Sequence, residues 1–106
     1  MKKSDSSQFD AEIAEIINLF IQQLPGKFTE ICESYEARNF PRLSELLHDL
    51  KGSSGNFGYD KLYSIARHME QAAKDGLIDE LGIMLQEAEK IVQSVILHPE
   101  QSSMSL

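Results

Sequence analysis

The chain has 106 residues, of which 42% are hydrophobic, and this suits a single small domain that buries its own core. Its net charge of −7 at pH 7 argues against binding to nucleic acid or to an anionic membrane surface. No apolar run is long enough to span a membrane, and no signal-peptide core follows the first residues. The single cysteine, Cys32, excludes an intramolecular disulfide and favours a reducing compartment, so we expect a cytoplasmic protein.

The first predicted helix spans residues 11–37. We expect residues 1–8, which are polar, to be flexible, and Asp10 to cap the helix at Ala11. Proline lacks an amide hydrogen and crowds the preceding turn, so Pro25 predicts one kinked helix or two short, nearly collinear ones. The apolar stripe nevertheless continues in phase across Pro25, through Ile13, Ile16, Ile17, Phe20, Ile21, Leu24, Phe28, Ile31 and Tyr35.

The second predicted helix runs from Pro41 to Ser54, with Asn39 as a candidate N-cap. Its core-facing stripe consists of Leu43, Leu46, Leu47 and Leu50. A helix stop and turn are predicted by three residues that accept left-handed backbone conformations, namely Gly55, Asn56 and Gly58. We expect Phe57, within this turn, to fill part of the core.

Two further amphipathic helices follow. The third is predicted over residues 59–74, with Leu62, Ile65, Ala66, Met69 and Ala73 facing inward. The fourth begins near Leu77 and turns inward Leu81, Met84, Leu85, Ala88, Ile91, Val92 and Val95. Pro99 lies beyond it, and residues 99–106 are expected to form a flexible tail. Helices joined by short turns predict an all-α fold, an antiparallel up-and-down four-helix bundle over residues 9–98.

A histidine on the second predicted helix is the first candidate for chemistry. At about 100° per residue, His48 points about 150° away from the centre of the leucine stripe and should stand in water. Lys51 and Gly52, three and four residues later, lie on the same side as His48. An exposed histidine alone is most often merely solvated, so its surroundings must decide.

Gly52 is the more informative neighbour. A glycine inside a helix costs about 1 kcal/mol relative to alanine, and nothing in the local pattern offsets that cost. Close approach by another molecule is one reason to keep it. A neutral imidazole is a nucleophile near neutral pH, and a lysine ammonium can hold phosphate oxygens. His48, Lys51 and Gly52 are therefore suited to accepting a phosphoryl group and passing it to a docked partner.

The segment from His48 to Gly58, followed by Leu62, resembles the histidine-containing phosphotransfer (HPt) domain of two-component phosphorelays. The shared pattern is a histidine, one residue, leucine, lysine and glycine, then small residues and a second glycine. The resemblance implies that His48 is phosphorylated, that Lys51 stabilises the phosphoryl group, and that Gly52 and Gly55 leave room for a docking receiver domain. The family often has a small residue just before the histidine, whereas this sequence has Leu47. The position of Leu47 in the leucine stripe places it in the core.

The resemblance also implies partners and a cofactor. The partners are response-regulator receiver domains, with a hybrid sensor histidine kinase as a further candidate, and Mg²⁺ is expected on the receiver, with no cofactor bound by this chain. The sequence has no GxxxxGK[ST] loop and no glycine-rich box of a histidine kinase, so we expect no autophosphorylation from ATP. A self-contained bundle makes a monomer the default expectation.

Other functions remain open at this point. A helical adaptor that binds a partner without phosphotransfer is the main alternative. A small hydrolase using His48 as general base ranks last, because no nucleophile or orienting partner is evident and the adjacent Asp49 diverges from His48 by about 100°. His68 is expected at the boundary of a helix face, His98 at a helix end, and no His or Cys pair has compact metal-ligand spacing.

Overall fold

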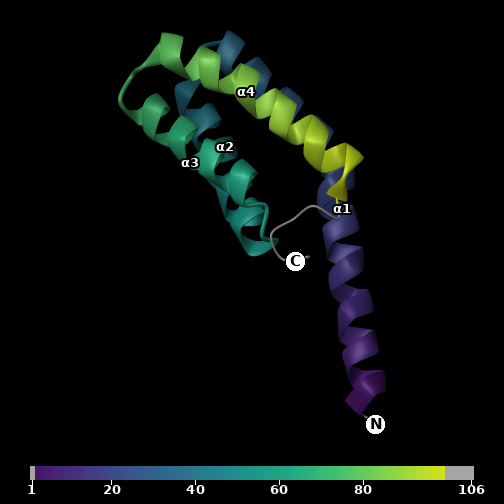
Figure 1. The fold of residues 1–106 in the computed structure, drawn as a ribbon. Helices are drawn as coiled ribbons and strands as arrows, with labels where there is room; N and C mark the ends of the chain where they lie inside the picture. The colour runs from purple at the N-terminus through teal and green to yellow at the C-terminus, as the bar shows by residue number, and fades with distance from the viewer. Residues whose placement is uncertain (1, 100–106) are drawn as a thin grey trace.

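A computed structural model describes residues 2–99 of the chain, with side chains from residue 11 onward. Four helices follow one another, α1 (Lys2–Glu36), α2 (Phe40–Asn56), α3 (Asp60–Lys74) and α4 (Ile78–Leu97), and residues 2–99 contain no strand. Each helix packs against the next, and α1 also packs against α4, which closes the bundle (Figure 1). The predicted all-α class and helical bundle are confirmed.

Two tyrosine hydroxyls fix the antiparallel order of the helices. Tyr35, at the end of α1, donates a hydrogen bond of 3.1 Å to the carbonyl oxygen of Ile78, at the start of α4. Tyr59, just before α3, donates one of 2.9 Å to the carbonyl oxygen of Pro99, just after α4. The end of one helix therefore meets the start of the other in both pairs, as an up-and-down bundle requires.

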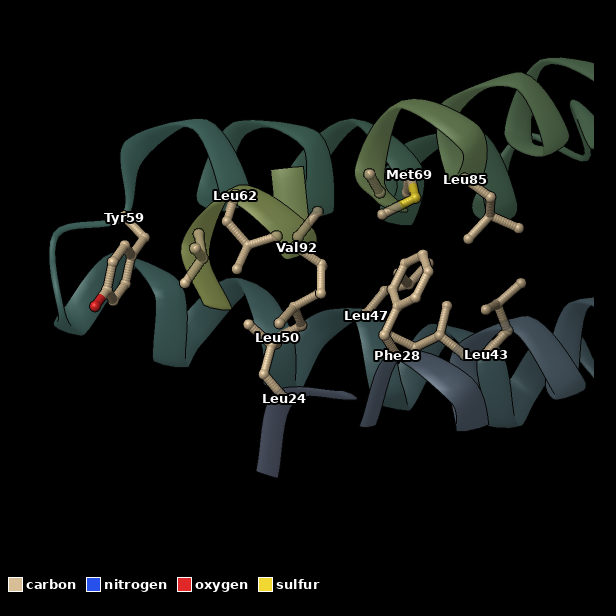
Figure 2. Packing of buried hydrophobic residues seen from close by; sticks show 14 of the residues in the cluster. Leu24, Phe28, Leu43, Leu47, Leu50, Tyr59, Leu62, Met69, Leu85 and Val92 are labelled. Atoms are coloured by element: carbon tan, nitrogen blue, oxygen red, sulfur yellow. The ribbon is translucent and has the colours of Figure 1, made fainter. Parts of the chain in front are cut away.

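The core lies between the inward faces of all four helices. Figure 2 shows side chains from the four helices meeting, with Leu24 and Phe28 of α1 opposite residues of α2, α3 and α4. Leu43, Leu47 and Leu50 are fully buried, so the predicted register of α2 is confirmed, including the core position of Leu47. Phe57 is half-buried and packs against this core, with its ring centroid 5.4 Å from that of Phe20.

Helix α1 differs most from the sequence-based expectation. It begins at Lys2, so the predicted start at Ala11 with Asp10 as N-cap is wrong. The physical reason is that no proline or glycine occurs before Pro25, and a capping propensity alone does not stop a helix. The helix also continues through Pro25 without a break, which rules out two separate helices. A kink at Pro25 and the flexibility of residues 1–8 stay predictions.

The exposed side of α1 also departs from the predicted stripe. Ile16 was placed among the inward residues, yet it is 52% exposed, as is Leu19. Figure 1 shows the N-terminal half of α1 reaching past the other three helices, so fewer neighbours are present to cover its apolar residues.

In the described part of the chain, no helix is both long and apolar enough to cross a membrane.

The helix ends agree closely with the turn chemistry of the sequence. The side chain of Asn39 accepts a hydrogen bond from the amide of Arg42, so the predicted N-cap is confirmed. Helix α2 continues to Asn56, so Gly55 lies in its last turn and the prediction of Gly55 as part of the connecting turn is wrong. Gly58, with φ of +76°, is the residue that takes the left-handed conformation. Of the predicted tail, only Pro99 lies within the described residues.

Candidate functional site

His48 stands on the outer face of α2, as the leucine register requires. Its side chain is 71% exposed, whereas its neighbour Leu47 is fully buried. Because the core fixes the rotation of α2, it also fixes the direction in which His48 leaves the helix. The predicted exposure of His48 is confirmed.

The nearest polar neighbour of His48 comes from α3. The Nδ1 atom of His48 lies 3.2 Å from Oε2 of Glu70, and the Glu70 side chain is only 9% exposed. Sequence analysis missed this residue. The sequence nevertheless indicates that Glu70 is unusual. It follows Leu62 and Ala66 at helical spacing, so it places a charged side chain on the apolar face of the helix. Which helix supplies its partner could be seen only in the fold.

The charge on Glu70 decides which nitrogen of His48 carries the proton. The hydrogen bond from Lys51, opposed by burial and aided by the His48 contact, holds the pKa of the Glu70 carboxyl below its usual range. An ionised carboxylate only accepts hydrogen bonds, so the Nδ1–H of His48 must be the donor. In the neutral ring the lone pair then lies on Nε2, the ring nitrogen that does not contact Glu70.

Two lysines share the same carboxylate. Nζ of Lys51 lies 2.8 Å from Oε1 of Glu70, and the Lys51 side chain is 26% exposed. Nζ of Lys74, at the end of α3, lies 3.8 Å from Oε2 and is much more exposed. Lys51, predicted from the sequence, and Lys74, which was not, therefore bring two positive charges to the buried Glu70 beside His48.

The two candidate glycines have different structural settings. A Cβ atom at Gly52 would meet nothing within 4 Å, so the fold itself gives no steric reason for glycine there. A Cβ atom at Gly55 would lie 3.1 Å from the ring of Tyr63, so Gly55 allows α2 and α3 to pack closely. Gly52 thus leaves bare backbone on the surface, four residues from His48. Gly26 shares the open surroundings of Gly52, and nothing in the structure explains it.

Asp49, which follows His48 in the chain, is engaged elsewhere. Asp49 forms an ion pair of 2.9 Å with Lys27 of α1 and does not touch His48. The orienting carboxylate that a general base would need is present after all, as Glu70, so that argument against a hydrolase is wrong. Among the side chains of residues 11–99, however, no serine, threonine or cysteine is hydrogen-bonded to His48. Within the same residues no group of three or more His, Cys, Asp or Glu side chains could hold a metal ion.

The family model described as the Hpt domain matches residues 15–96, which is most of the chain and includes α2, α3 and nearly all of α4. The chain belongs to the Hpt domain family. Searches of curated proteins and of solved structures each found no match.

Membership of this family fixes the general function. Hpt domains carry phosphoryl groups on histidine in two-component phosphorelays, work with receiver domains and histidine kinases, and lack kinase activity of their own. The Hpt match spans His48, Lys51, Gly52 and Glu70. The roles of these individual residues are the subject of the proposals that follow.

Proposed function

We propose that this Hpt domain is a phosphorelay intermediate that accepts a phosphoryl group on His48 from the phosphoaspartate of one receiver domain and passes it to the aspartate of another. The observation that carries the proposal is the contact between Nδ1 of His48 and the ionised Glu70. That contact keeps the proton on Nδ1 and leaves Nε2 exposed as the nucleophile.

The transfer is balanced in both directions. The lone pair of Nε2 attacks the phosphorus atom of the receiver's acyl phosphate, the P–O bond to the aspartate breaks, and the carboxylate leaves with its electron pair. The product is a phosphoramidate whose ring carries a proton on Nδ1 and a positive charge, which Glu70 stabilises at 3.2 Å. The attack of a second receiver's carboxylate on phosphorus reverses these bond changes and regenerates the neutral ring.

Further properties belong to the same proposal. We expect Lys51 to contribute positive charge near the phosphoryl oxygens, and Mg²⁺ to be held by the acidic pocket of the receiver rather than by this chain. We expect no autophosphorylation from ATP, a monomeric state and a cytoplasmic location. A hybrid sensor histidine kinase remains a candidate source of the donor receiver.

The docking surface is proposed to combine α2 with the exposed edge of α1. Lys27 and Glu30 of α1 form ion pairs with α2, so they mark the side of α1 that borders α2. Ile16 precedes Lys27, and Leu19 precedes Glu30, by eleven residues or about three helical turns, which returns each to nearly the same side. Exposed apolar residues therefore lie on the side of α1 that borders α2.

The direct test is phosphoryl transfer from a panel of phosphorylated receiver domains to the wild-type protein and to His48→Gln. We expect acid-labile, base-stable label on the wild type and none on the variant. His68→Gln is the matched control, because His68 is also exposed on a helix, and it should take up label like the wild type.

Two results would overturn the proposal. Label that persists in His48→Gln would move the site to His68 or His98. A folded wild-type protein that takes label from no receiver, and whose biological output survives His48→Gln, would favour the helical adaptor.

A further inference from the structure

A cavity of about 450 Å³ lies between the start of α3 and the second half of α4. We propose that it binds a small organic anion with an apolar body, a molecule of the kind of a medium-chain carboxylate, and that Lys61 and Lys90 hold the anionic group. Glu70 follows Lys61 by nine residues, or about 14 Å along α3, and contacts α2 rather than α4. The cavity is therefore separate from the surroundings of His48, and its occupation does not rest on phosphotransfer.

The walls of the cavity are largely apolar. Tyr59 and Leu62, at the start of α3, are buried core residues, as is Val95 of α4, and Ile91 packs partly buried against the same core. Because the core holds these side chains in place, the cavity is formed before any ligand arrives. Its volume lies within the range of about 300–1,000 Å³ that is usual for small-molecule sites.

Two lysines bring positive charge to this apolar cavity. Lys61 and Lys90 are both exposed, and among the side chains of residues 11–99 neither forms an ion pair with a carboxylate. Of the nine residues that line the cavity, Asp60 is the one acid. With His98 neutral, the two lysines and Asp60 leave the lining with one net positive charge.

This concentration of unpaired cations is unusual within the molecule. Four other basic side chains lie within ion-pair distance of a carboxylate, namely Lys27, Arg42, Lys51 and Lys74. Arg38 lies over the ring of Tyr35. Among residues 11–99 only Arg67 also lacks an ion pair, and it does not line the cavity. A chain of net charge −7 repels anions in general, so an anion must be attracted by such a local group of cations.

The combination of apolar walls and positive charge defines the class of ligand. An inorganic anion would interact with the lysines but would leave the apolar walls in water, whereas a neutral apolar molecule would bury the walls without using the lysines. A molecule with an apolar body and one anionic group gains both contributions. Ser94, one turn after Lys90 on α4, also lines the cavity, and its hydroxyl can donate a hydrogen bond to an anionic oxygen.

The test uses octanoate as the probe and 1-octanol as its neutral match. Both are titrated into the protein and followed by the amide chemical shifts in ¹H–¹⁵N NMR spectra, which locate the bound molecule. We expect octanoate to shift the amides of the α3 and α4 residues that line the cavity, with a lower Kd than 1-octanol. The same titrations are carried out on Lys61→Gln, Lys90→Gln, Arg67→Gln and Ser94→Trp.

Each variant addresses one part of the proposed site. One unit charge at about 4 Å in water changes a binding constant about fivefold, so Lys61→Gln and Lys90→Gln should each raise the Kd for octanoate about fivefold. Neither should change the Kd for 1-octanol. Arg67→Gln removes the same charge from α3 outside the cavity and is the matched control, with a smaller effect on octanoate. Ser94→Trp places a large side chain in the cavity and should weaken the binding of both probes.

Three results would overturn the proposal. The first is octanoate that shifts no amides, or only amides away from the cavity. The second is octanoate and 1-octanol that bind with the same Kd. The third is a Kd for octanoate that Arg67→Gln raises as much as Lys61→Gln and Lys90→Gln do. Uptake of phosphoryl groups by His48 is a separate measurement, and without octanoate it should be the same in these lysine variants as in the wild type.

Discussion

Glu70 joins the two residues that the sequence motif predicts to act together, with one carboxylate oxygen facing the His48 ring and the other facing Lys51. His48 and Lys51 are a turn apart on α2, but it is a buried acid on α3 that relates them. The hydrogen bonding of the ring, the charge of the site and the pairing of two helices therefore depend on the same side chain.

Glu70→Gln removes the charge of this acceptor while keeping its shape. A hydrogen bond to a charged group contributes roughly 1.5–3 kcal/mol, so we expect the rate of phosphoryl uptake by His48 to fall at least about tenfold. The measurement is the initial rate at which His48 is labelled by potassium phosphoramidate, a small phosphoryl donor that needs no docking partner. The rates of wild type and variant are compared at equal folded fraction, which circular dichroism reports. An unchanged rate would show that Glu70 does not orient the reacting ring.

Acid should destabilise the fold through the same residue. The pKa of Glu70 is lowered in the folded protein, chiefly by Lys51, so its stabilising contribution is present above the pKa of the unfolded chain. That contribution is lost as the pH falls through the folded-state pKa. Urea unfolding at a series of pH values from neutral down to below the ordinary glutamate value of about 4.3 should therefore show a difference between wild type and Glu70→Gln that shrinks as the pH falls. A difference that is constant across this range would contradict the assignment.

Substitutions at Gly52 should separate folding from docking. Because a Cβ atom at this position meets nothing, Gly52→Ala should stabilise the fold by about 1 kcal/mol through helix propensity. Gly52→Gln should also fold, yet slow transfer from a phosphorylated receiver while leaving labelling by phosphoramidate unchanged. Equal loss with both donors would indicate damage to the His48 ring environment instead of obstructed docking.

Gly82, unlike Gly52, has a neighbouring side chain where its own Cβ atom would lie. A Cβ atom there would lie 2.6 Å from the hydroxyl oxygen of Tyr35, which donates to the carbonyl oxygen of Ile78. Gly82→Ala should therefore stabilise the protein less than Gly52→Ala, because the hydroxyl must move. In a Tyr35→Phe background the hydroxyl is absent, and Gly82→Ala should recover the full effect of helix propensity in chemical unfolding. Equal effects in the two backgrounds would show that the hydroxyl imposes no constraint.

Truncation of the exposed apolar residues of α1 should affect docking more than stability. Ile16→Ala and Leu19→Ala each remove a side chain that is half in water, so the unfolding temperature should change little. Transfer from a receiver should slow, whereas labelling by phosphoramidate should not. Ile83→Ala is the matched control, since Ile83 is 67% exposed on α4 and should leave both reactions unchanged.

The sequence predicted what local patterns determine. Leucine spacing fixed the register of α2 and with it the exposure of His48 and the burial of Leu47. The motif from His48 to Gly58 indicated the family, which the match over residues 15–96 confirms. Gly55 was assigned to a turn because glycine permits one, but its place is set by contact with Tyr63, a residue of the next helix.

What was missed depends on contacts between helices. The pairing of Glu70 with His48 joins positions 22 residues apart, and no periodicity within one helix reports it. The exposure of Ile16 likewise reflects where the other helices stop rather than the α1 sequence. The start of α1 was misplaced because a good capping residue permits a helix end without imposing one.

The division of His48 and Glu70 between two helices would make the proposed reactivity of His48 a property of the assembled bundle. When α2 and α3 separate, the ring loses the acceptor that selects its tautomer and both lysines lose the carboxylate that gathers them. An unfolded copy of the chain would then be a poor acceptor, and it would draw few phosphoryl groups from the relay. The amount of phosphoryl group that this protein carries would consequently depend on the fraction of its copies that are folded. That fraction depends in turn on how stably α2 packs against α3.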